Sequence, residues 1–466
     1  MIKIPRLLLR LATAVLLPGL LSACATRPIN PRLERIVPSE GYRSTAHAIR
    51  KSLHDTEILI TFSGGGMRAA AFAFGVLEEL RRQELEVRGA RVTLLNEVDL
   101  ISGVSGGGFT ALAYGLYGDR LFDGFADQFL KRDVQGELLK RIANPANWPK
   151  ILSTGVGRSE LAADYYDEIL FHGATFGDLI PLPGPLVIAG STDISTGARL
   201  AFAQRDWDII CSDLSAVRLS RAAAATSAVP VVLSPVTINN YGGTCGYRYP
   251  AWVDTPDPEA AAAVGGRLLQ RQAEMRSFEQ STKRPYLHLV DGGIADNLGL
   301  RPILERFRAT EVSPEFRRQL GIENVRRTLI IVVNSRSDPR TDWDQSESGP
   351  SALSLALQSV NLPIDHNSFE ALEILKDVLA RWNNAWRILK AADGTGAPSG
   401  VSRIRLYPVV VSFDLVSDDS LRARLMALPT SFSLSAEDVD MLRGEAGSLL
   451  RRSPEFKAFL KDLQDQ

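Results

Sequence analysis

The stretch NEVDLISGVSGGGFTALAYG, from Asn96 to Gly115, decides the fold. An apolar, strand-like run ends at Gly103, Ser105 follows among four glycines, and an apolar segment of helical character comes next. The residues GVSGG match the pattern G-x-S-x-G, in which a serine stands on a tight turn between a strand and a helix. Gly103 and Gly107 suit such an elbow because β-carbons around the serine would clash. By itself, the pattern fits a structural turn as well as a nucleophile.

A second segment with the same order lies upstream. The strand-like run EILITFS (57–63) leads into three glycines and then into the helical pattern MRAAAFAFGVLEELRRQ. Two strand–turn–helix units in succession predict an α/β fold with parallel strands. Further strands are expected in PLVIAG, LAFA, YLHLVD, RTLIIVVN and RIRLYPVVVSF.

The composition is that of a soluble globular protein. The chain has 466 residues, of which 45% are hydrophobic and 23% are charged. Its 53 basic side chains balance 54 acidic ones, so no charge field points to nucleic acid or to an acidic substrate. With 3 cysteines and no zinc-ligand spacing, neither a disulfide scaffold nor a metal site is expected.

The N-terminus indicates export. Basic residues from Lys3 to Arg10 precede an apolar run from Leu11 to Leu21, and small residues then lead to Cys24. This order is typical of a secretory signal, and the apolar run is shorter than the roughly 20 residues of a membrane-spanning helix. The letters LSAC resemble the bacterial lipobox, which implies cleavage after residue 23 and lipidation of Cys24. An ordinary signal peptide or a membrane anchor is the alternative.

The residue after Cys24 is Ala25, where an aspartate would favour retention in the inner membrane. By that resemblance we expect a lipid-anchored protein of the bacterial envelope, on the periplasmic face of the outer membrane. The periplasm is oxidising, so Cys211 and Cys245 either form a disulfide or remain two separate buried thiols. The sequence leaves both open because it does not place their Cα atoms.

Two other segments carry candidate functional groups. SGGGMR (63–68) is a glycine turn at a helix start, where backbone N–H groups face an incoming oxygen. It lacks the spacing of a phosphate-binding P-loop, but a plain turn would have the same letters. DGGIADN (291–297) closes a strand-like run, and Asp291 there is either a base for a serine hydroxyl or an ordinary turn aspartate.

A Ser-His-Asp triad would need one of the 5 histidines. None of them stands in a context typical of a triad: His47, His54, His172, His288 and His366. His288 lies three residues before Asp291 and so tends toward the opposite face of its strand. A serine–aspartate dyad is the better interpretation, and a general esterase with a triad is the alternative.

Taken in order, the three segments resemble the patatin-like phospholipase family, which has a glycine-rich oxyanion loop, then G-x-S-x-G, then D-G-G. The resemblance covers roughly residues 57 to 335 and includes TFGDL (175–179) and SAVPVVLSPV (227–236). It implies a three-layer α/β/α sandwich with a mostly parallel central sheet, and lipid ester hydrolysis without a metal or another cofactor. The sequence departs from the family at Ala69, where the motif often has glycine.

Residue by residue, the resemblance makes Ser105 the nucleophile and Asp291 its base. It assigns oxyanion binding to the loop made of Gly64, Gly65, Gly66, Met67 and the adjacent basic Arg68. The remaining motif positions are Gly103 and Gly107 of the elbow and Gly292 and Gly293 of D-G-G. The implied substrate is a membrane phospholipid or another fatty-acyl ester, as for phospholipase A or lysophospholipase. A catalytically silent lipoprotein that binds lipid or a partner is an alternative of another class.

The expected organisation has four regions. Residues 1–23 are a signal peptide, 24–55 a polar tether, 56–340 the patatin-like domain and 341–466 a mainly helical extension packed on it. Residues 256–283 are expected to insert a mostly exposed helix into the domain. The apolar segment SALSLALQSV (351–360) fits core packing, the lining of an acyl site or contact with a membrane.

Overall fold

The computed structural model describes residues 26–43, 52–87, 89–153, 155–249, 266–312, 324–338, 342–391 and 404–464. The signal segment, Cys24 and the first part of the expected insertion lie outside the described residues. Among the helices of the described ranges, none is both long and apolar enough to span a bilayer.

One eight-stranded sheet forms the centre of the molecule, in the order β10-β9-β1-β4-β5-β8-β7, with β6 also paired to β5. Five neighbouring strands are parallel: β10 (Arg405–Ser412), β9 (Arg327–Asn334), β1 (Thr56–Phe62), β4 (Leu100–Val104) and β5 (Leu186–Asp193). The remaining strands pair antiparallel: β6 (Arg199–Phe202) and β8 (Tyr286–Asp291) with β5, and β7 (Val236–Asn239) with β8. A separate hairpin joins β2 (Glu84–Val87) to β3 (Ala90–Thr93).

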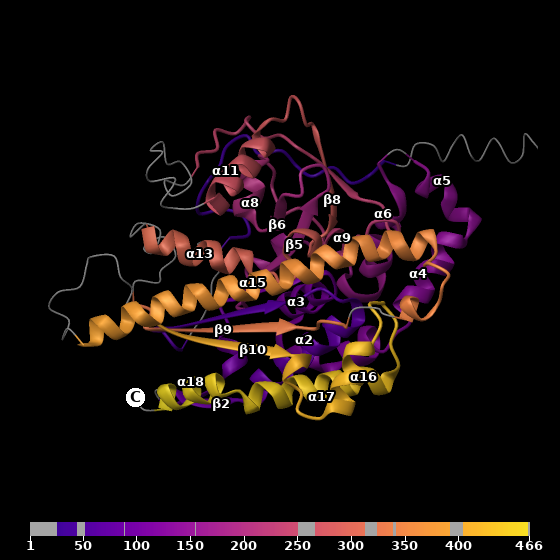
Figure 1. Ribbon diagram of the computed structural model, residues 1–466. Helices are drawn as coiled ribbons and strands as arrows, with labels where there is room; N and C mark the ends of the chain where they lie inside the picture. Colours follow the sequence, from indigo (N-terminus) through magenta and orange to yellow (C-terminus); the bar gives the residue numbers. More distant parts are fainter. Residues whose placement is uncertain are drawn as a thin grey trace, which may run out of the picture.

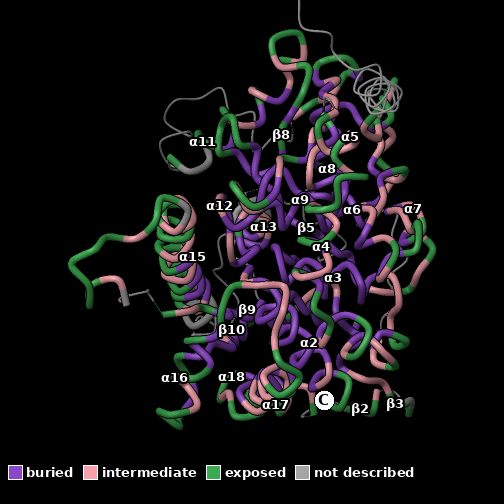
Figure 2. The backbone as a smooth tube through the Cα atoms, turned by 90° about the vertical axis from the view of Figure 1, so that its right-hand side faces the viewer, coloured by how far each residue is buried: buried purple, intermediate pink, exposed green. Residues whose placement is uncertain are grey.

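Every residue of β1, β5 and β9 is buried, as expected for parallel strands covered on both faces. Figure 2 shows this buried centre, with α15 to its left and α17 below it. One face is covered by α2 (Gly66–Arg82), α3 (Ser105–Tyr117), α17 (Ala436–Arg452) and α18 (Pro454–Gln464). The other is covered by α12 (Gly293–Asp296), α13 (Arg301–Val312) and α15 (Ala352–Ala391). The predicted three-layer α/β/α sandwich with a mostly parallel sheet is confirmed (Figure 1).

Shorter helices surround this frame. They are α4 (Val134–Ala143), α5 (Trp148–Ile151), α6 (Gly157–Tyr166), α7 (Phe176–Leu179), α8 (Gln204–Ile209), α9 (Leu219–Thr226), α11 (Gly266–Glu279) and α16 (Asp419–Ala427). Residues after 341 also complete the central layers, because β10 pairs with β9 along its whole length and α17 packs on α2.

Residues 26–43 pack against the domain, so the expected tether from 24 to 55 does not hold for them. Tyr42 is buried, and its hydroxyl accepts the backbone N–H of Val187 at 2.7 Å. Asn30 is also buried and donates to the hydroxyl of Ser212 at 2.8 Å. The proline-rich, polar composition resembled a linker, but these polar groups find protein partners in place of water.

The disulfide that the sequence left open is present, with the Cα atoms of Cys211 and Cys245 5.6 Å apart. It lies beside the N-terminal segment, since the N–H of Leu33 donates to the carbonyl oxygen of Cys211 at 2.8 Å.

The described part of the expected insertion is the helix α11, and it is not mostly exposed. Its Met275 and Phe278 are buried in the core, and its Arg271 is buried in an ionic cluster. The sequence favoured exposure because α11 is rich in charged residues, several of which are paired inside the protein.

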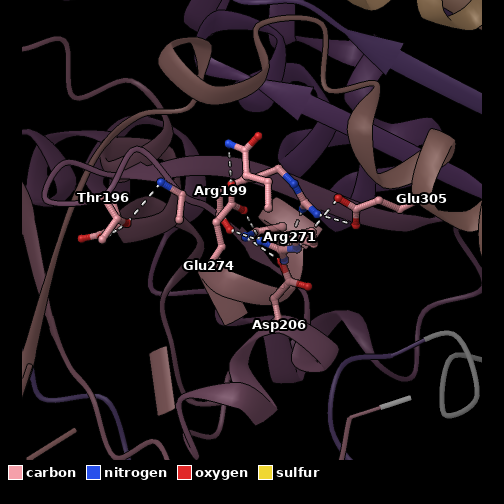
Figure 3. Close-up of polar contacts among 10 residues, drawn as sticks. Thr196, Arg199, Asp206, Arg271, Glu274 and Glu305 are labelled. Carbon is pink, nitrogen blue, oxygen red and sulfur yellow. Dashed lines mark hydrogen bonds and ion pairs between the residues drawn. The ribbon is translucent and has the colours of Figure 1, made fainter. Parts of the chain in front are cut away.

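The ionic cluster joins α11 to the sheet and to α13. Arg199 on β6 pairs with Asp206 at 3.4 Å and with Glu305 at 2.8 Å. Arg271 pairs with Asp206 at 3.4 Å and with Glu274 at 3.2 Å. Figure 3 shows the two guanidinium groups lying between the three carboxylates. Burial lowers the pKa of Arg199, but Glu305 and Asp206 more than offset this and raise it above its ordinary value.

Candidate active site

Ser105 lies at the junction of β4 and α3 with a φ of 49°, in the left-handed region that few residues other than glycine adopt. Such a conformation persists only where the surroundings hold it. Here the N–H of Ser105 donates to the hydroxyl of Thr226 at 2.9 Å, and that hydroxyl donates to the carbonyl oxygen of Gly190. Thr226, the last residue of α9, therefore fixes the elbow, and sequence reasoning did not single it out.

The glycines after Ser105 allow α3 to begin against the core. A β-carbon on Gly107 would lie 2.6 Å from the Cβ atom of Phe62 on β1. A β-carbon on Gly103 would lie 2.8 Å from the Cα atom of Gly108 in the first turn of α3. The two glycines predicted from G-x-S-x-G thus serve close backbone packing around the serine.

The glycine loop 64–66 lies beside Ser105, since a β-carbon on Gly64 would be 3.3 Å from the Cβ atom of the serine. The N–H of Gly64 donates to the carbonyl oxygen of Asn297 at 3.0 Å, and that of Met67 donates to the carbonyl oxygen of Ser431 at 2.7 Å. Among the described residues, no acceptor is bonded to the N–H groups of Gly65 and Gly66. The structure therefore leaves only the inner two of the four predicted amides for a ligand oxygen.

Positive electrostatic potential converges on this loop. The loop leads into α2 and Ser105 begins α3, so two helix N-termini meet at the site. Arg68 is buried behind the loop, where it donates to the carbonyl oxygen of Leu428 and to the hydroxyl of Thr430. Burial lowers the pKa of Arg68 to about 10, so the guanidinium stays charged at neutral pH.

Asp291 ends β8 and is buried. Its carboxylate accepts the N–H of Gly293 at 2.8 Å, and the Ser105 side chain interacts with the carboxylate and lowers its pKa. Its backbone is held by Ala228, which accepts the Asp291 N–H at 3.0 Å, and by Thr192, whose hydroxyl donates to the Asp291 carbonyl oxygen at 2.9 Å. Burial raises the pKa of Asp291 to about 6, although the Gly293 N–H and the Ser105 side chain oppose that rise.

Strand register explains how residues so distant in sequence meet. On one side of β5, Gly190 pairs with Val104, the residue before Ser105. On the other side, Ser191 pairs with Asp291. Gly292 is needed at this crossing because a β-carbon there would lie 2.3 Å from the carbonyl oxygen of Gly190.

Among the described residues, no histidine is bonded to Ser105 or to the carboxylate of Asp291. His288 is exposed on β8 and bonds the hydroxyl of Thr237 at 3.0 Å. In the described ranges, the carboxylate of Asp291 accepts a hydrogen bond from Gly293, and no imidazole is bonded to it. His47 lies outside the described residues.

Helix α15 forms an outer wall of the site at Ile364 and Ser368, just after the segment 351–360 for which the sequence left the lining of an acyl site open. The side chain of Asn297 donates to the hydroxyl of Ser368 at 3.0 Å. A β-carbon on Gly293 would lie 3.4 Å from the Cδ1 atom of Ile364. The carboxylate of Asp365 interacts electrostatically with Arg68. The sequence signals for this helix were its apolar start at 351–360 and the helical pattern SFEALEILKDVLARW (368–382).

Comparison with solved structures finds distant similarities to this chain. The chain is similar to human GIVD cytosolic phospholipase A2, with 13% identity and a TM-score of 0.42, over 89% of this chain and 63% of that one. The same human enzyme in complex with methyl gamma-linolenyl fluorophosphonate shows 13% identity and a TM-score of 0.40. That match covers 89% of this chain and 60% of the other. VipD from Legionella pneumophila shows 11% identity and a TM-score of 0.23, and the match covers 92% of this chain and 72% of VipD. The chain thus spans less than two thirds of the human enzyme.

No curated protein sequence matches the chain. The family model of the patatin-like phospholipases matches residues 60–304, which include the glycine loop, Ser105 and Asp291. This match covers more than half of the sequence, and the chain therefore belongs to the patatin-like phospholipase family.

Proposed function

We propose that the chain is a serine lipid acyl hydrolase that works through a dyad of Ser105 and Asp291. The observation that carries this proposal is the strand register that brings Ser105, directly after Val104, close to the buried carboxylate of Asp291. The Ser105 side chain interacts with that carboxylate and lowers its pKa. A serine needs such a base because its hydroxyl is a weak nucleophile at neutral pH. With a pKa of about 6, Asp291 is ionised at neutral pH and is still basic enough to take a proton.

In the acylation step, Oγ of Ser105 attacks the ester carbonyl carbon while Asp291 takes the hydroxyl proton. The carbonyl electron pair moves onto the oxygen, and the N–H groups of Gly65 and Gly66 stabilise the resulting oxyanion. When the tetrahedral intermediate collapses, the ester C–O bond breaks and the leaving alkoxide takes the proton from Asp291. The products are an alcohol and an acyl group esterified to Ser105.

In the deacylation step, water replaces the alcohol. Asp291 takes a proton from the water as its oxygen attacks the acyl carbon. The bond from that carbon to Oγ of Ser105 then breaks, Ser105 regains the proton, and a fatty acid leaves. The loop and Arg68 hold positive potential at the oxyanion through both steps.

The substrate that we propose is a membrane phospholipid or lysophospholipid. Family membership supports a lipid ester, and the apolar side chain of Ile364 on α15 lies next to the site. We also propose that Cys24 is lipidated and holds the protein at the periplasmic face of the outer membrane. The disulfide between Cys211 and Cys245 is in keeping with an oxidising compartment. Metabolic labelling with a fatty acid, compared between wild type and Cys24→Ser, tests the anchor.

The proposal is tested by assaying Ser105→Ala and Asp291→Asn beside wild type on p-nitrophenyl esters and on phospholipids. Each variant should lose at least about 10³-fold in kcat, because the nucleophile and its base act as one unit. Ser359→Ala and Asp123→Asn, both on the exposed surface, serve as matched controls and should keep wild-type turnover. Equal turnover in all the proteins would refute the dyad. If wild type binds lipid without turnover, the chain is a silent lipid-binding lipoprotein.

A further inference from the structure

Helix α15 changes character along its length. Its C-terminal half packs on the core through the buried side chains of Leu375, Val378, Leu379 and Trp382. In the half that lies over the site, none of the described side chains from 354 to 367 is buried. Yet the sequence from Ser348 to Ile364 has no charged residue and is rich in leucine. An apolar segment is therefore displayed at the surface, and core packing does not explain it.

Three large side chains form a row on the outward face of this half. Leu355, Leu362 and Phe369 are 55%, 46% and 57% exposed. They are seven residues apart, close to two helical turns, so they lie along one side of the helix. We call these three residues the outer row.

The inward face of the same turns makes polar contacts, beside the apolar side chain of Ile364. Asp365 interacts with Arg68, and Ser368 bonds the side chain of Asn297. A surface helix normally shows the opposite arrangement, with its apolar stripe toward the core. An outward apolar row on a helix with polar inner contacts indicates a second apolar environment outside the protein.

Ser105 and the N-terminal half of α15 lie toward the same end of the molecule, where the parallel strands have their carboxyl ends. In Figure 1, β9 and β10 point toward the end that holds the N-terminal half of α15, with α4 and α5 nearby. Other large apolar side chains are exposed on the segments of this end. They are Val231 and Val232, close in sequence to Ala228, and Trp148 and Leu152 at α5. Tryptophan with aliphatic neighbours is typical of contacts with the polar–apolar boundary of a bilayer.

We propose that the outer row of α15 inserts into the surface of a phospholipid bilayer and so places the Ser105 site against its substrate. This inference rests on the proposed lipid hydrolase function. A bilayer suits the row better than a second copy of the chain, because three side chains are too few for the roughly 800 Å² per partner of a stable interface. The lack of charge from Ser348 to Ile364 suits shallow burial in lipid. Residues 351–369 also lie outside the stretch that the family model matches.

A local fluorescent reporter tests the proposal without needing catalysis. Ser359 is exposed on the half that carries the outer row, and Ser420 is exposed on α16 as the matched control. Each is changed to cysteine in the full chain carrying Cys24→Ser, so that the label has one reactive thiol beside the disulfide. The label is an environment-sensitive nitrobenzoxadiazole dye, and the probe is a phosphatidylglycerol–phosphatidylcholine vesicle with and without a shallow nitroxide lipid.

With vesicles, the dye at position 359 should shift to shorter wavelength and be quenched by the nitroxide, while the dye at position 420 should show neither change. Adding Leu355→Ser, Leu362→Ser and Phe369→Ser should weaken the response at position 359 by at least about tenfold in lipid affinity. The same number of substitutions at Ile29, Leu269 and Leu415, also exposed, should leave it intact.

The proposal is overturned if the dye at position 359 does not respond, if position 420 responds equally, or if the response follows protein concentration without vesicles. The last result would mean self-association. The measurement works equally in Ser105→Ala protein, so a lipid-binding row on an inactive protein is distinguishable from an active enzyme without such a row.

Discussion

The backbone of Gly106 touches the backbone of Gly66, so that a β-carbon on Gly106 would lie 1.8 Å from the carbonyl oxygen of Gly66. The start of α3 and the start of α2 are thereby held in direct contact, with Ser105 on one side and the free amides of the glycine loop on the other. This contact fixes the distance between the proposed nucleophile and the proposed oxyanion donors.

Gly106→Ala should lower kcat for ester hydrolysis by at least about 100-fold. The added methyl group must push the starts of α2 and α3 apart and so misplace the oxyanion donors. Gly444→Ala is the matched control, since Gly444 lies on α17 with no atom near its missing β-carbon. That control should be active and up to about 1 kcal/mol more stable. Wild-type activity in Gly106→Ala would contradict the contact.

Thr226 should act as a positioning residue for the elbow. Thr226→Val keeps the shape but removes the hydroxyl that accepts the Ser105 N–H and donates to Gly190. We expect kcat to fall by about 10- to 100-fold with KM little changed, because the left-handed conformation of Ser105 loses its support. Thr226→Ser restores the hydroxyl and should recover most of kcat. If valine and serine behave alike in kinetic assays, the hydroxyl has no such role.

The pH dependence should follow Asp291. Only its ionised form can take the Ser105 proton, so kcat/KM should rise with pH up to about 6 and then level off. Below that value, activity should fall about tenfold per pH unit. A profile that stays flat down to pH 4.5, measured where the fold is intact, would contradict Asp291 as the base.

The raised pKa of Asp291 also makes the stability of the fold depend on pH. Because burial raises the pKa of Asp291 in the folded state, the folded protein binds this proton more tightly than the unfolded chain does. The contribution of Asp291 to stability is therefore most favourable below its unfolded pKa and is lost as pH rises through about 6. Asp291→Asn should stabilise the fold at pH 8, by on the order of 2–3 kcal/mol, and much less at pH 5. Calorimetric melting at both pH values, with Asp123→Asn as control, checks the sign.

The buried ionic cluster should be a large determinant of stability. Arg199→Ala leaves Asp206 and Glu305 in the interior with less compensation, and should cost about 3–5 kcal/mol of unfolding free energy. Lys376→Ala removes an exposed partner of Glu373 and should leave the melting temperature unchanged. Urea unfolding of both variants provides the comparison, and similar midpoints would show that the cluster contributes little.

The sequence was sufficient for the sheet core and the motif residues, because buried parallel strands and glycine turns leave local patterns. EILITFS became β1, and GVSGG marked the turn at Ser105. The contacts of Thr226 and Ser431 were not predictable, since a threonine hydroxyl and a backbone carbonyl far along the chain leave no local signal. Met67 was expected to bind the oxyanion, but its N–H is bonded to Ser431.

One segment was misread and another was left open, because composition does not show what a surface packs against. Residues 26–43 read as a tether, although Asn30 and Tyr42 find buried partners. The segment 351–360 fitted the core as well as a membrane contact, and the structure places none of its described side chains in the core.

Covalent trapping of the nucleophile tests the central claim most directly. A fluorophosphonate reacts only with a serine whose hydroxyl is activated by a base, and peptide mapping then identifies the modified residue. We predict modification of Ser105 in wild type, a rate at least about 100-fold slower in Asp291→Asn, and no labelling in Ser105→Ala. Labelling of another serine, or undiminished labelling in Ser105→Ala, would contradict the Ser105–Asp291 dyad.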